Sequence, residues 1–249
     1  MSFVGRSVLI SGAAMGIGLA TAGRFLEHGA DVWLADRDER ALASACGDLP
    51  LARRDRAIVL DVTNEDDWAD AASRIATAGG LDVLINNAGR GHFRMLADTS
   101  LAEWREIRAV NVDALFLGTR AVLPMLAASG SGAIVNVASI RGMTSGPGSG
   151  SYSAAKGAAR MFGKAAALEF AALGNGVRVN TVNPGLIDTP LSRAVFNDPA
   201  ASARRLADIP LGRAGTAEEV ADAIVFLASD AAAYITGAEV TIDGGQTAG

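Results

Sequence analysis

Cysteine and histidine are scarce in this sequence, which has one cysteine, Cys46, and two histidines among 249 residues. A single cysteine cannot form an intrachain disulfide, and no zinc-like spacing occurs, so we expect no metal site. The N-terminus lacks the charged region and long apolar segment of a signal peptide. No apolar run approaches the length of a membrane span. These absences predict a cytoplasmic protein with no membrane partner.

Clustered positive charge is also missing. Lysine and arginine number 22 against 27 aspartates and glutamates, which gives a formal net charge of −5. Such a chain is not expected to bind nucleic acid. Hydrophobic residues make up 50% of the chain and charged residues 20%, a balance that suits a buried parallel sheet. No linker-like tract divides the chain, so a single domain over 1–249 accounts for its length.

Short apolar runs alternate with helical patterns along the chain. Strands are expected at 7–11, 31–35, 57–60, 81–85, 133–137, 177–182 and 239–242, and helices near 16–28, 38–46, 65–78, 100–127, 151–173 and 216–229. This alternation predicts an α/β fold of the Rossmann type, a doubly wound parallel seven-stranded sheet with helices on both faces. The least regular stretch, 186–213, contains Pro190, Pro199 and Pro210, and we expect it to be a mobile substrate lid.

A glycine-rich turn follows the first predicted strand and precedes a helix. Gly12, Gly16 and Gly18 are interspersed with Met15 and Ile17 in the spacing G-x-x-x-G-x-G. Backbone N–H groups and the helix dipole at such a turn point toward a phosphate. Glycine also removes side chains where a pyrophosphate or a neighbouring strand must come close. The turn therefore predicts a nucleotide site.

Asp36 ends the second predicted strand, and Arg37 follows directly. In a doubly wound fold, an acid at this place accepts hydrogen bonds from the ribose hydroxyls of NAD and repels a 2′-phosphate. Arg37 could pair with that phosphate, but positions 13–15 are Ala, Ala and Met and add no positive charge. This pattern favours NAD over NADP.

Tyr152 and Lys156 stand four residues apart, and Ser139 lies thirteen residues before the tyrosine. On a helix, positions i and i+4 share a face. A neighbouring cation lowers the pKa of a phenol from its ordinary value of about 10. With a serine hydroxyl on the same substrate oxygen, these groups could move a proton on or off an alcohol. Neither His28 nor His92 is near them in sequence, so no nucleophile–base pair for acyl transfer is expected.

Taken together, these residues resemble the classical short-chain dehydrogenase/reductase family over nearly the whole chain. The motifs that carry the resemblance are Ser11-Gly12-Ala13-Ala14-Met15-Gly16-Ile17-Gly18, Asp61-Val62, Asn86-Asn87-Ala88-Gly89, Asn111, Ser139, Tyr152-x-x-x-Lys156, Pro184-Gly185, Ile187-Asp188-Thr189 and Ile242-Asp243-Gly244-Gly245. Ser11 replaces the usual threonine and keeps its hydroxyl.

The resemblance implies a role for each motif. Tyr152 would be the general acid/base, Lys156 would lower its pKa and hold the nicotinamide ribose, and Ser139 would orient the substrate oxygen. Asn111 would support a water chain that relays the proton. The residues expected to bind the cofactor are Gly12, Met15, Gly16, Ile17, Gly18, Asp36, Arg37, Asp61, Val62, Asn87, Ala88, Gly89, Tyr152, Lys156, Pro184, Gly185, Ile187 and Thr189.

The substrate pocket is expected between the loop after the fourth strand, the loop after Ser139 and the lid. Its candidate residues are His92, Arg141, Met143, Ser149, Leu186 and Phe196. Apolar lid side chains favour a cyclic or bulky apolar secondary alcohol, such as a hydroxysteroid or a cyclohexanol. The alternative is an acyl-carrier-protein ketoreductase that uses NADPH. Two other classes are less favoured. A non-catalytic nucleotide sensor would be expected to lose Tyr152 or Lys156, and both are present. An NAD-using epimerase or dehydratase would be expected to carry an added C-terminal substrate domain.

Two predicted helices, 100–127 and 151–173, are apolar on more than one face. A helix of this kind needs a second surface to bury it. Members of the family that resemble this chain commonly form tetramers through these helices. We therefore expect a homotetramer with 222 symmetry.

Overall fold

A seven-stranded parallel sheet forms the centre of the computed structural model, which describes residues 1–49 and 54–249. The strands are ordered β3-β2-β1-β4-β5-β6-β7, and all neighbours are parallel. They are β1 (Ser7–Ser11), β2 (Asp31–Asp36), β3 (Ala57–Val59), β4 (Val83–Asn86), β5 (Ala133–Val137), β6 (Arg178–Pro184) and β7 (Glu239–Ile242). The predicted doubly wound sheet is confirmed. Its order reverses between β1 and β4, where such folds bind ligands at the carboxyl ends of the strands.

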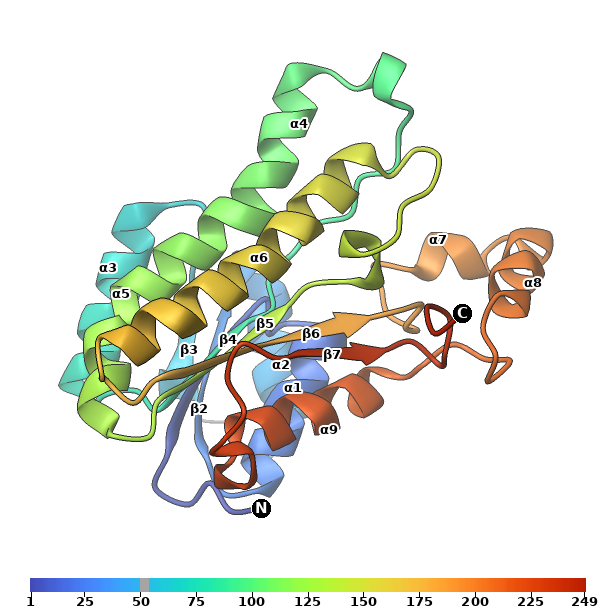
Figure 1. Cartoon of the computed structure of the whole chain (residues 1–249). Coiled ribbons are helices and arrows are strands. Elements are labelled where there is room, and N and C mark those ends of the chain that lie inside the picture. Colours follow the sequence, from blue (N-terminus) through green and yellow to red (C-terminus); the bar gives the residue numbers. More distant parts are fainter. Residues whose placement is uncertain (50–53) are drawn as a thin grey trace.

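Helices cover both faces of the sheet (Figure 1). Helices α3 to α6 pack on one face, and α1, α2 and α9 pack on the other (Figure 1). The helices are α1 (Gly16–Glu27), α2 (Glu39–Asp48), α3 (Glu65–Thr77), α4 (Leu101–Arg108), α5 (Ala114–Ser129), α6 (Gly150–Ala172), α7 (Arg193–Phe196), α8 (Pro199–Ala207) and α9 (Ala217–Ala228). A π-helical turn, η3 (Ala109–Asp113), joins α4 to α5, and a 3₁₀ turn, η4 (Ile140–Gly142), follows β5.

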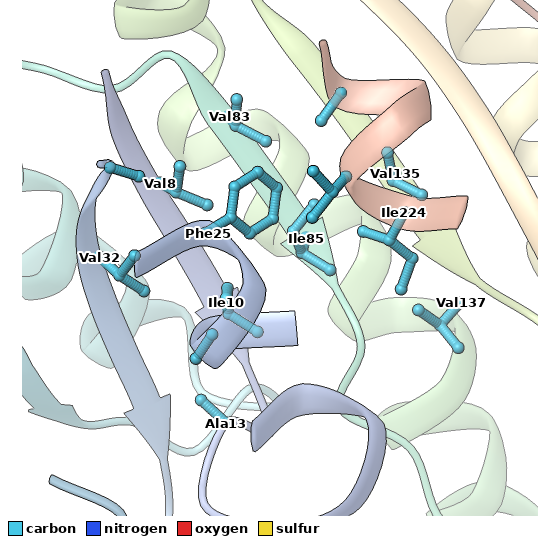
Figure 2. Packing of buried hydrophobic residues seen from close by; sticks show 14 of the residues in the cluster. Val8, Ile10, Ala13, Phe25, Val32, Val83, Ile85, Val135, Val137 and Ile224 are labelled. Atoms are coloured by element: carbon cyan, nitrogen blue, oxygen red, sulfur yellow. The ribbon is translucent and has the colours of Figure 1, made fainter. Parts of the chain in front are cut away.

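The core lies on both faces of the sheet, which explains why the strands are apolar throughout. Phe25 of α1 is fully buried against the β1–β4 side of the sheet, close to Ile10 and Ile85 (Figure 2). On the other face, Trp68 of α3 and Leu84 of β4 belong to a second buried cluster. Each fully buried side chain of this size contributes on the order of 1.5–3 kcal/mol. This packing fixes the strand ends that carry the site.

Helix α4, the turn η3 and helix α5 form one continuous helix, Leu101–Ser129, that is long and apolar enough by length and composition to cross a membrane. The apolar runs of the sequence gave no such indication, because Asp113 and Arg120 interrupt them. Core helices of globular proteins pass the same test. Only 33% of its most apolar window is buried, so much of its apolar surface is not covered by residues 1–49 and 54–249.

The stretch 186–213 is more regular than expected, because it contains the short helices α7 and α8. Pro199 begins α8, and proline suits the first turn of a helix because its missing N–H would have no partner there. The two helices extend beyond the carboxyl ends of β6 and β7 (Figure 1). They therefore lie on the side of the sheet where the candidate site is found.

Candidate active site

The turn after β1 can only be built from glycine at two of its positions. A Cβ on Gly18 would clash with the carbonyl oxygen of Gly12, and a Cβ on Gly12 would lie 2.9 Å from the Cα of Ala88. Gly12 and Gly16 also have φ angles of 64° and 54°, in the left-handed region that disfavours other residues. The turn thus packs β1, α1 and the end of β4 tightly together.

Helix α1 begins without a side-chain cap. Its N-cap, Met15, accepts no hydrogen bond through its side chain, and its first turn has no acidic residue. Helices α2, α3, α4 and α9 are instead capped by Asp38, Asn64, Ser100 and Thr216. The first N–H groups of a helix need an acceptor from elsewhere, and a phosphate group is a favourable one. The turn and Met15 to Gly18 therefore fit the pyrophosphate of a dinucleotide.

Asp36 lies beside this turn at the end of β2. Its Oδ2 accepts a hydrogen bond from the N–H of Ala14 at 3.2 Å, and its Oδ1 accepts one from the N–H of Asp38 at 3.1 Å. These bonds fix the carboxylate at the place where the second strand meets the glycine turn. A carboxylate has lone pairs left for further donors, so Asp36 can also accept from ribose hydroxyls.

Arg37 is exposed, and its charge acts on Asp61. The hydrogen bonds from Thr63 lower the pKa of Asp61, and the charge of Arg37 lowers it further. Asp61 and the buried Val62 follow β3, and both are among the residues expected to bind the cofactor. Part of the positive charge of Arg37 is therefore balanced by Asp61.

Ser11 organises the end of β4. Its hydroxyl accepts hydrogen bonds from the N–H groups of Asn87 and Ala88, both at 3.1 Å, and donates to the carbonyl of Ile85. The Asn87 side-chain amide donates to the carbonyls of Ser11 and Gly12 at 2.9 Å. Serine thus supplies the hydroxyl that threonine would supply, and Asn87 and Ala88 are held against the glycine turn.

Asn111 lies in the π-helical turn η3, an arrangement that is frequent at functional sites. Its side-chain amide donates to the carbonyls of Ile107 and Arg90, both at 3.0 Å, and its Oδ1 accepts from the N–H of Arg90 at 3.3 Å. A Cβ on Gly89 would lie 3.0 Å from this Oδ1 and 3.2 Å from the Nζ of Lys156. Gly89, Asn111 and Lys156 therefore meet, as the predicted site requires.

Tyr152 and Lys156 share a buried face of α6, as the sequence predicted. Lys156 donates from Nζ to the carbonyl of Val137 at 2.9 Å, and Nζ lies 5.8 Å from the centroid of the Tyr152 ring. Burial lowers the pKa of Lys156 to about 8. Burial raises the pKa of Tyr152, and its hydrogen bond with Ser139 and the charge of Arg141 oppose that rise. Arg141 is thus a second cation near the phenol, besides the Lys156 that the sequence predicted there.

The loop after β6 closes over the glycine turn. A Cβ on Gly16 would contact the side chain of Thr189 at 3.5 Å. Ile187 is buried, and Gly185 packs so closely on Asp243 that a Cβ there would lie 2.7 Å from the Asp243 Cβ. Pro184 ends β6, and its carbonyl accepts a hydrogen bond from the Ser139 hydroxyl at 3.4 Å. The loop thus lies between the glycine turn and the Ser139 side of the site.

A cavity of about 280 Å³ is connected to Tyr152 through the side chain of Phe93. Phe93 lines it and also contacts the Tyr152 ring, with 5.7 Å between ring centroids. The lining residues are Phe93, Arg141, Gly146, Pro147, Ser149, Arg204, Arg205 and Asp208. This lining agrees with the expected position of the substrate pocket. Four of its residues belong to the loop after Ser139, and three belong to the segment 186–213.

Two of the six candidate substrate residues, Arg141 and Ser149, line the cavity. His92 does not: its ring binds the Ser151 hydroxyl at 3.2 Å and lies 3.5 Å from Glu103. Met143, Leu186 and Phe196 also lie outside the lining. Sequence reasoning missed Arg204, Arg205 and Asp208, because it expected no helix there. Their spacing is the available signal, since positions i and i+3 or i+4 of a helical turn share a face.

The comparisons with known proteins agree with this geometry. A family model described as enoyl-(acyl carrier protein) reductase matches residues 12–247. The chain belongs to the short-chain dehydrogenase/reductase family. The cyclopentanol dehydrogenase of Comamonas sp. (strain NCIMB 9872) is 40% identical over 243 residues, covering 97% of this chain and 96% of the relative. The 3-alpha-(or 20-beta)-hydroxysteroid dehydrogenase of Mycobacterium bovis is 39% identical over 248 residues, covering 99% and 91%.

A solved structure shows the same fold with a nucleotide. It is assigned as an NAD(P)-dependent gluconate 5-dehydrogenase from Beutenbergia cavernae, with NADP bound at low occupancy. It is 35% identical to this chain, with a TM-score of 0.91 over 100% of this chain and 99% of the other. As a short-chain dehydrogenase/reductase, the chain is an oxidoreductase of a family that uses a nicotinamide cofactor, and the relatives named above are secondary-alcohol dehydrogenases.

Proposed function

We propose that this protein is an NAD-dependent dehydrogenase that interconverts a cyclic or bulky apolar secondary alcohol and its ketone. One observation carries the proposal above all: Tyr152, Ser139 and Lys156 converge, and Phe93 links the phenol of Tyr152 to a cavity. These groups can hold and move a proton at an alcohol oxygen but provide no acyl-transfer nucleophile.

In alcohol oxidation, the Ser139 hydroxyl donates a hydrogen bond to the substrate oxygen, and the Tyr152 phenolate takes the hydroxyl proton. The chemistry that a bound nicotinamide would supply is that of a hydride acceptor for the carbinol carbon. Lys156 holds the nicotinamide ribose, and the positive charges of Lys156 and Arg141 favour the phenolate. Asn111 fixes the loop carbonyl of Arg90 and supports the water chain that returns the proton to solvent.

Asp36 supports a preference for NAD. Its carboxylate is held beside the glycine turn by the N–H groups of Ala14 and Asp38, so a 2′-phosphate would meet a fixed negative charge. Arg37 is the residue that could offset this repulsion, since it is exposed and follows Asp36 directly. The glycine turn itself supplies no cation, since positions 13–15 are Ala, Ala and Met.

The size of the cavity favours a small ring over a steroid. About 280 Å³ falls just below the range of about 300–1,000 Å³ that is typical of ligand pockets. Phe93 offers an apolar wall and is 65% exposed, so it can be covered by a substrate ring. Cyclopentanol, the alcohol in the name of one relative, is a ring small enough for a cavity of this volume. Residues 186–213 serve as the lid, since α8 supplies Arg204 and Arg205 to the lining.

A second candidate is an acyl-carrier-protein reductase that uses NADPH. The observation that favours it is the exposed pair Arg204 and Arg205 at the mouth of the cavity, because an acidic carrier protein would be attracted there. The description of the matching family model points the same way. Asp36 argues against NADPH and keeps this candidate second.

We further propose a homotetramer in the cytoplasm, with no nucleic-acid or membrane partner. Leu101, Trp104 and Phe116 of the continuous helix are exposed, as are Met161 and Leu168 of α6. An apolar surface of this extent on paired helices is typical of an interface between copies. Light scattering tests this assembly: a monomeric mass at micromolar concentration would exclude it.

The proposed reaction is tested by absorbance at the reduced-nicotinamide band. NAD and NADP are each supplied with cyclopentanol, cyclohexanol, a hydroxysteroid, a polyol and a 3-hydroxyacyl thioester, and Tyr152→Phe serves as the inactive control. We expect turnover with NAD and a cyclic alcohol. Turnover only with NADP and the thioester would favour the second candidate, and no turnover of any alcohol with either nucleotide would contradict the proposal.

A further inference from the structure

The cavity beside Tyr152 is strongly positive, whereas the chain as a whole is negative. Three of its lining residues are arginines, Arg141, Arg204 and Arg205, and one is an acid, Asp208. The lining therefore carries three positive charges and one negative charge, while the whole chain has a formal net charge of −5. A local reversal of sign in a concave site raises the local concentration of an oppositely charged ligand.

These three guanidinium groups are not paired within the described part of the chain. None of them takes part in an ion pair or a side-chain hydrogen bond found among residues 1–49 and 54–249. Arginines nearby are paired: Arg94 with Glu103 at 2.6 Å and Arg213 with Glu219 at 2.5 Å. What sets the three cavity arginines apart is that they share one concave site, with Asp208 as the single acid in its lining.

The absence of a charged partner is most unfavourable for Arg141, because its side chain is half-buried whereas Arg204 and Arg205 are exposed. Burial lowers its pKa, and the like charge of Arg205 lowers it further, while Tyr152 and Asp208 act in the other direction. A partly buried cation beside a second cation is electrostatically unfavourable unless an anion joins them. A carboxylate is well suited to this task, since guanidinium groups bind it through paired, charge-assisted hydrogen bonds.

We propose that the cavity binds an oxyanion on the substrate, so that the preferred substrate is a small cyclic secondary alcohol that also carries a carboxylate or a similar anionic group. This inference rests on the proposed function, because it names the substrate class of the same site. Arg141 stands two residues after Ser139 and shares the cavity with Phe93. The ring would lie on Phe93 with its hydroxyl toward Tyr152 and Ser139, and its anionic group between Arg141 and Arg205.

The test compares two substrates that differ only in charge, 3-hydroxycyclohexane-1-carboxylate and its primary amide, with the full-length protein and NAD or NADP. We expect kcat/KM for the acid to exceed that for the amide by about 10- to 100-fold at low salt, and to fall as salt is added. The advantage should appear mainly in KM. Arg205→Gln should remove most of it, whereas Arg213→Gln, an arginine paired with Glu219 outside the cavity, should keep it.

Equal use of acid and amide, while cyclic alcohols are turned over, would overturn the inference and leave the proposed function intact. A preference for the acid that survives in Arg205→Gln would also overturn it. If no alcohol is turned over, the proposed function fails, and calorimetry of the same acid and amide with the protein decides the anion site separately. Binding of the acid alone, weakened by Arg205→Gln, would support the site, and equal or absent binding of both would refute it.

Discussion

Replacing Lys156 by methionine should stabilise the protein at neutral pH while abolishing activity. Lys156 is buried at 4% exposure, and burial lowers its pKa from the ordinary 10.5 to about 8. Each pKa unit corresponds to about 1.4 kcal/mol, so the ammonium costs on the order of 3 kcal/mol more in the folded protein than in water. Methionine has a similar length and no charge. The substitution therefore removes the free-energy cost of burying the ammonium, a cost that proteins commonly carry where activity requires the buried group.

The gain is reduced because the carbonyl of Val137 loses its hydrogen bond from Nζ. An unsatisfied buried acceptor costs about 1–3 kcal/mol. The net gain at pH 7 is therefore between about 0 and 2 kcal/mol, and about 2–4 °C in Tm is expected for each kcal/mol in a chain of this size.

The pH dependence provides the sharper test. The folded pKa of Lys156 lies below its unfolded value, so the unfolded chain binds more protons between about pH 8 and 10.5. The stability of the wild-type protein should therefore rise across this window relative to Lys156→Met. We expect the difference in the free energy of unfolding to change by about 3 kcal/mol between pH 7.5 and 10.5, measured by urea unfolding at fixed protein concentration.

The matched control is Lys164→Met, eight residues further along α6. Lys164 is 44% exposed and pairs with Glu239 at 2.7 Å, so its loss should change stability by less than about 1 kcal/mol and leave activity intact. If the difference between the wild-type protein and Lys156→Met were the same at every pH, the buried-ammonium argument would be refuted.

Three further substitutions test the site. Tyr152→Phe should lower kcat at least about 100-fold, because the general acid/base is lost, while fluorescence titration shows nearly unchanged nucleotide binding; near-normal turnover would exclude the assigned proton transfer. Gly18→Ala should abolish nucleotide binding and lower Tm, because its Cβ would clash with the Gly12 carbonyl oxygen; a soluble variant with normal affinity would contradict this packing. Asp36→Ala should reduce the ratio of kcat/KM with NAD to that with NADP by about 10-fold or more, and an unchanged ratio would show that Asp36 does not select the nucleotide.

The glycine turn and the pair Tyr152 and Lys156 could be read from the sequence because each is a local feature. A strand, a turn and a helix are contiguous in the chain, and i, i+4 spacing places two side chains on one helix face. The structure accordingly places Gly12 and Gly18 in a turn that tolerates no Cβ. It places Tyr152 and Lys156 on the same buried face of α6.

The lining of the cavity could not be read in this way. Arg204 and Arg205 line one cavity with Arg141 only because the fold places α8 beyond the carboxyl ends of the strands. These segments are about sixty residues apart in sequence. The same holds for Arg141 as the cation that opposes the rise in the pKa of Tyr152. Sequence spacing predicted Lys156 beside the phenol, but it could not predict Arg141, which comes from the turn after β5.

The sequence by itself determined the class of this protein: the parallel sheet from its apolar runs, the glycine turn after β1 from its glycines, and the shared helix face of Tyr152 and Lys156 from their spacing. Each of these depends on local backbone geometry and on periodicity, which are written directly in the order of residues. Only the tertiary structure decided which charges line the cavity, because electrostatic interactions depend on distance and burial between segments that the chain brings together when it folds.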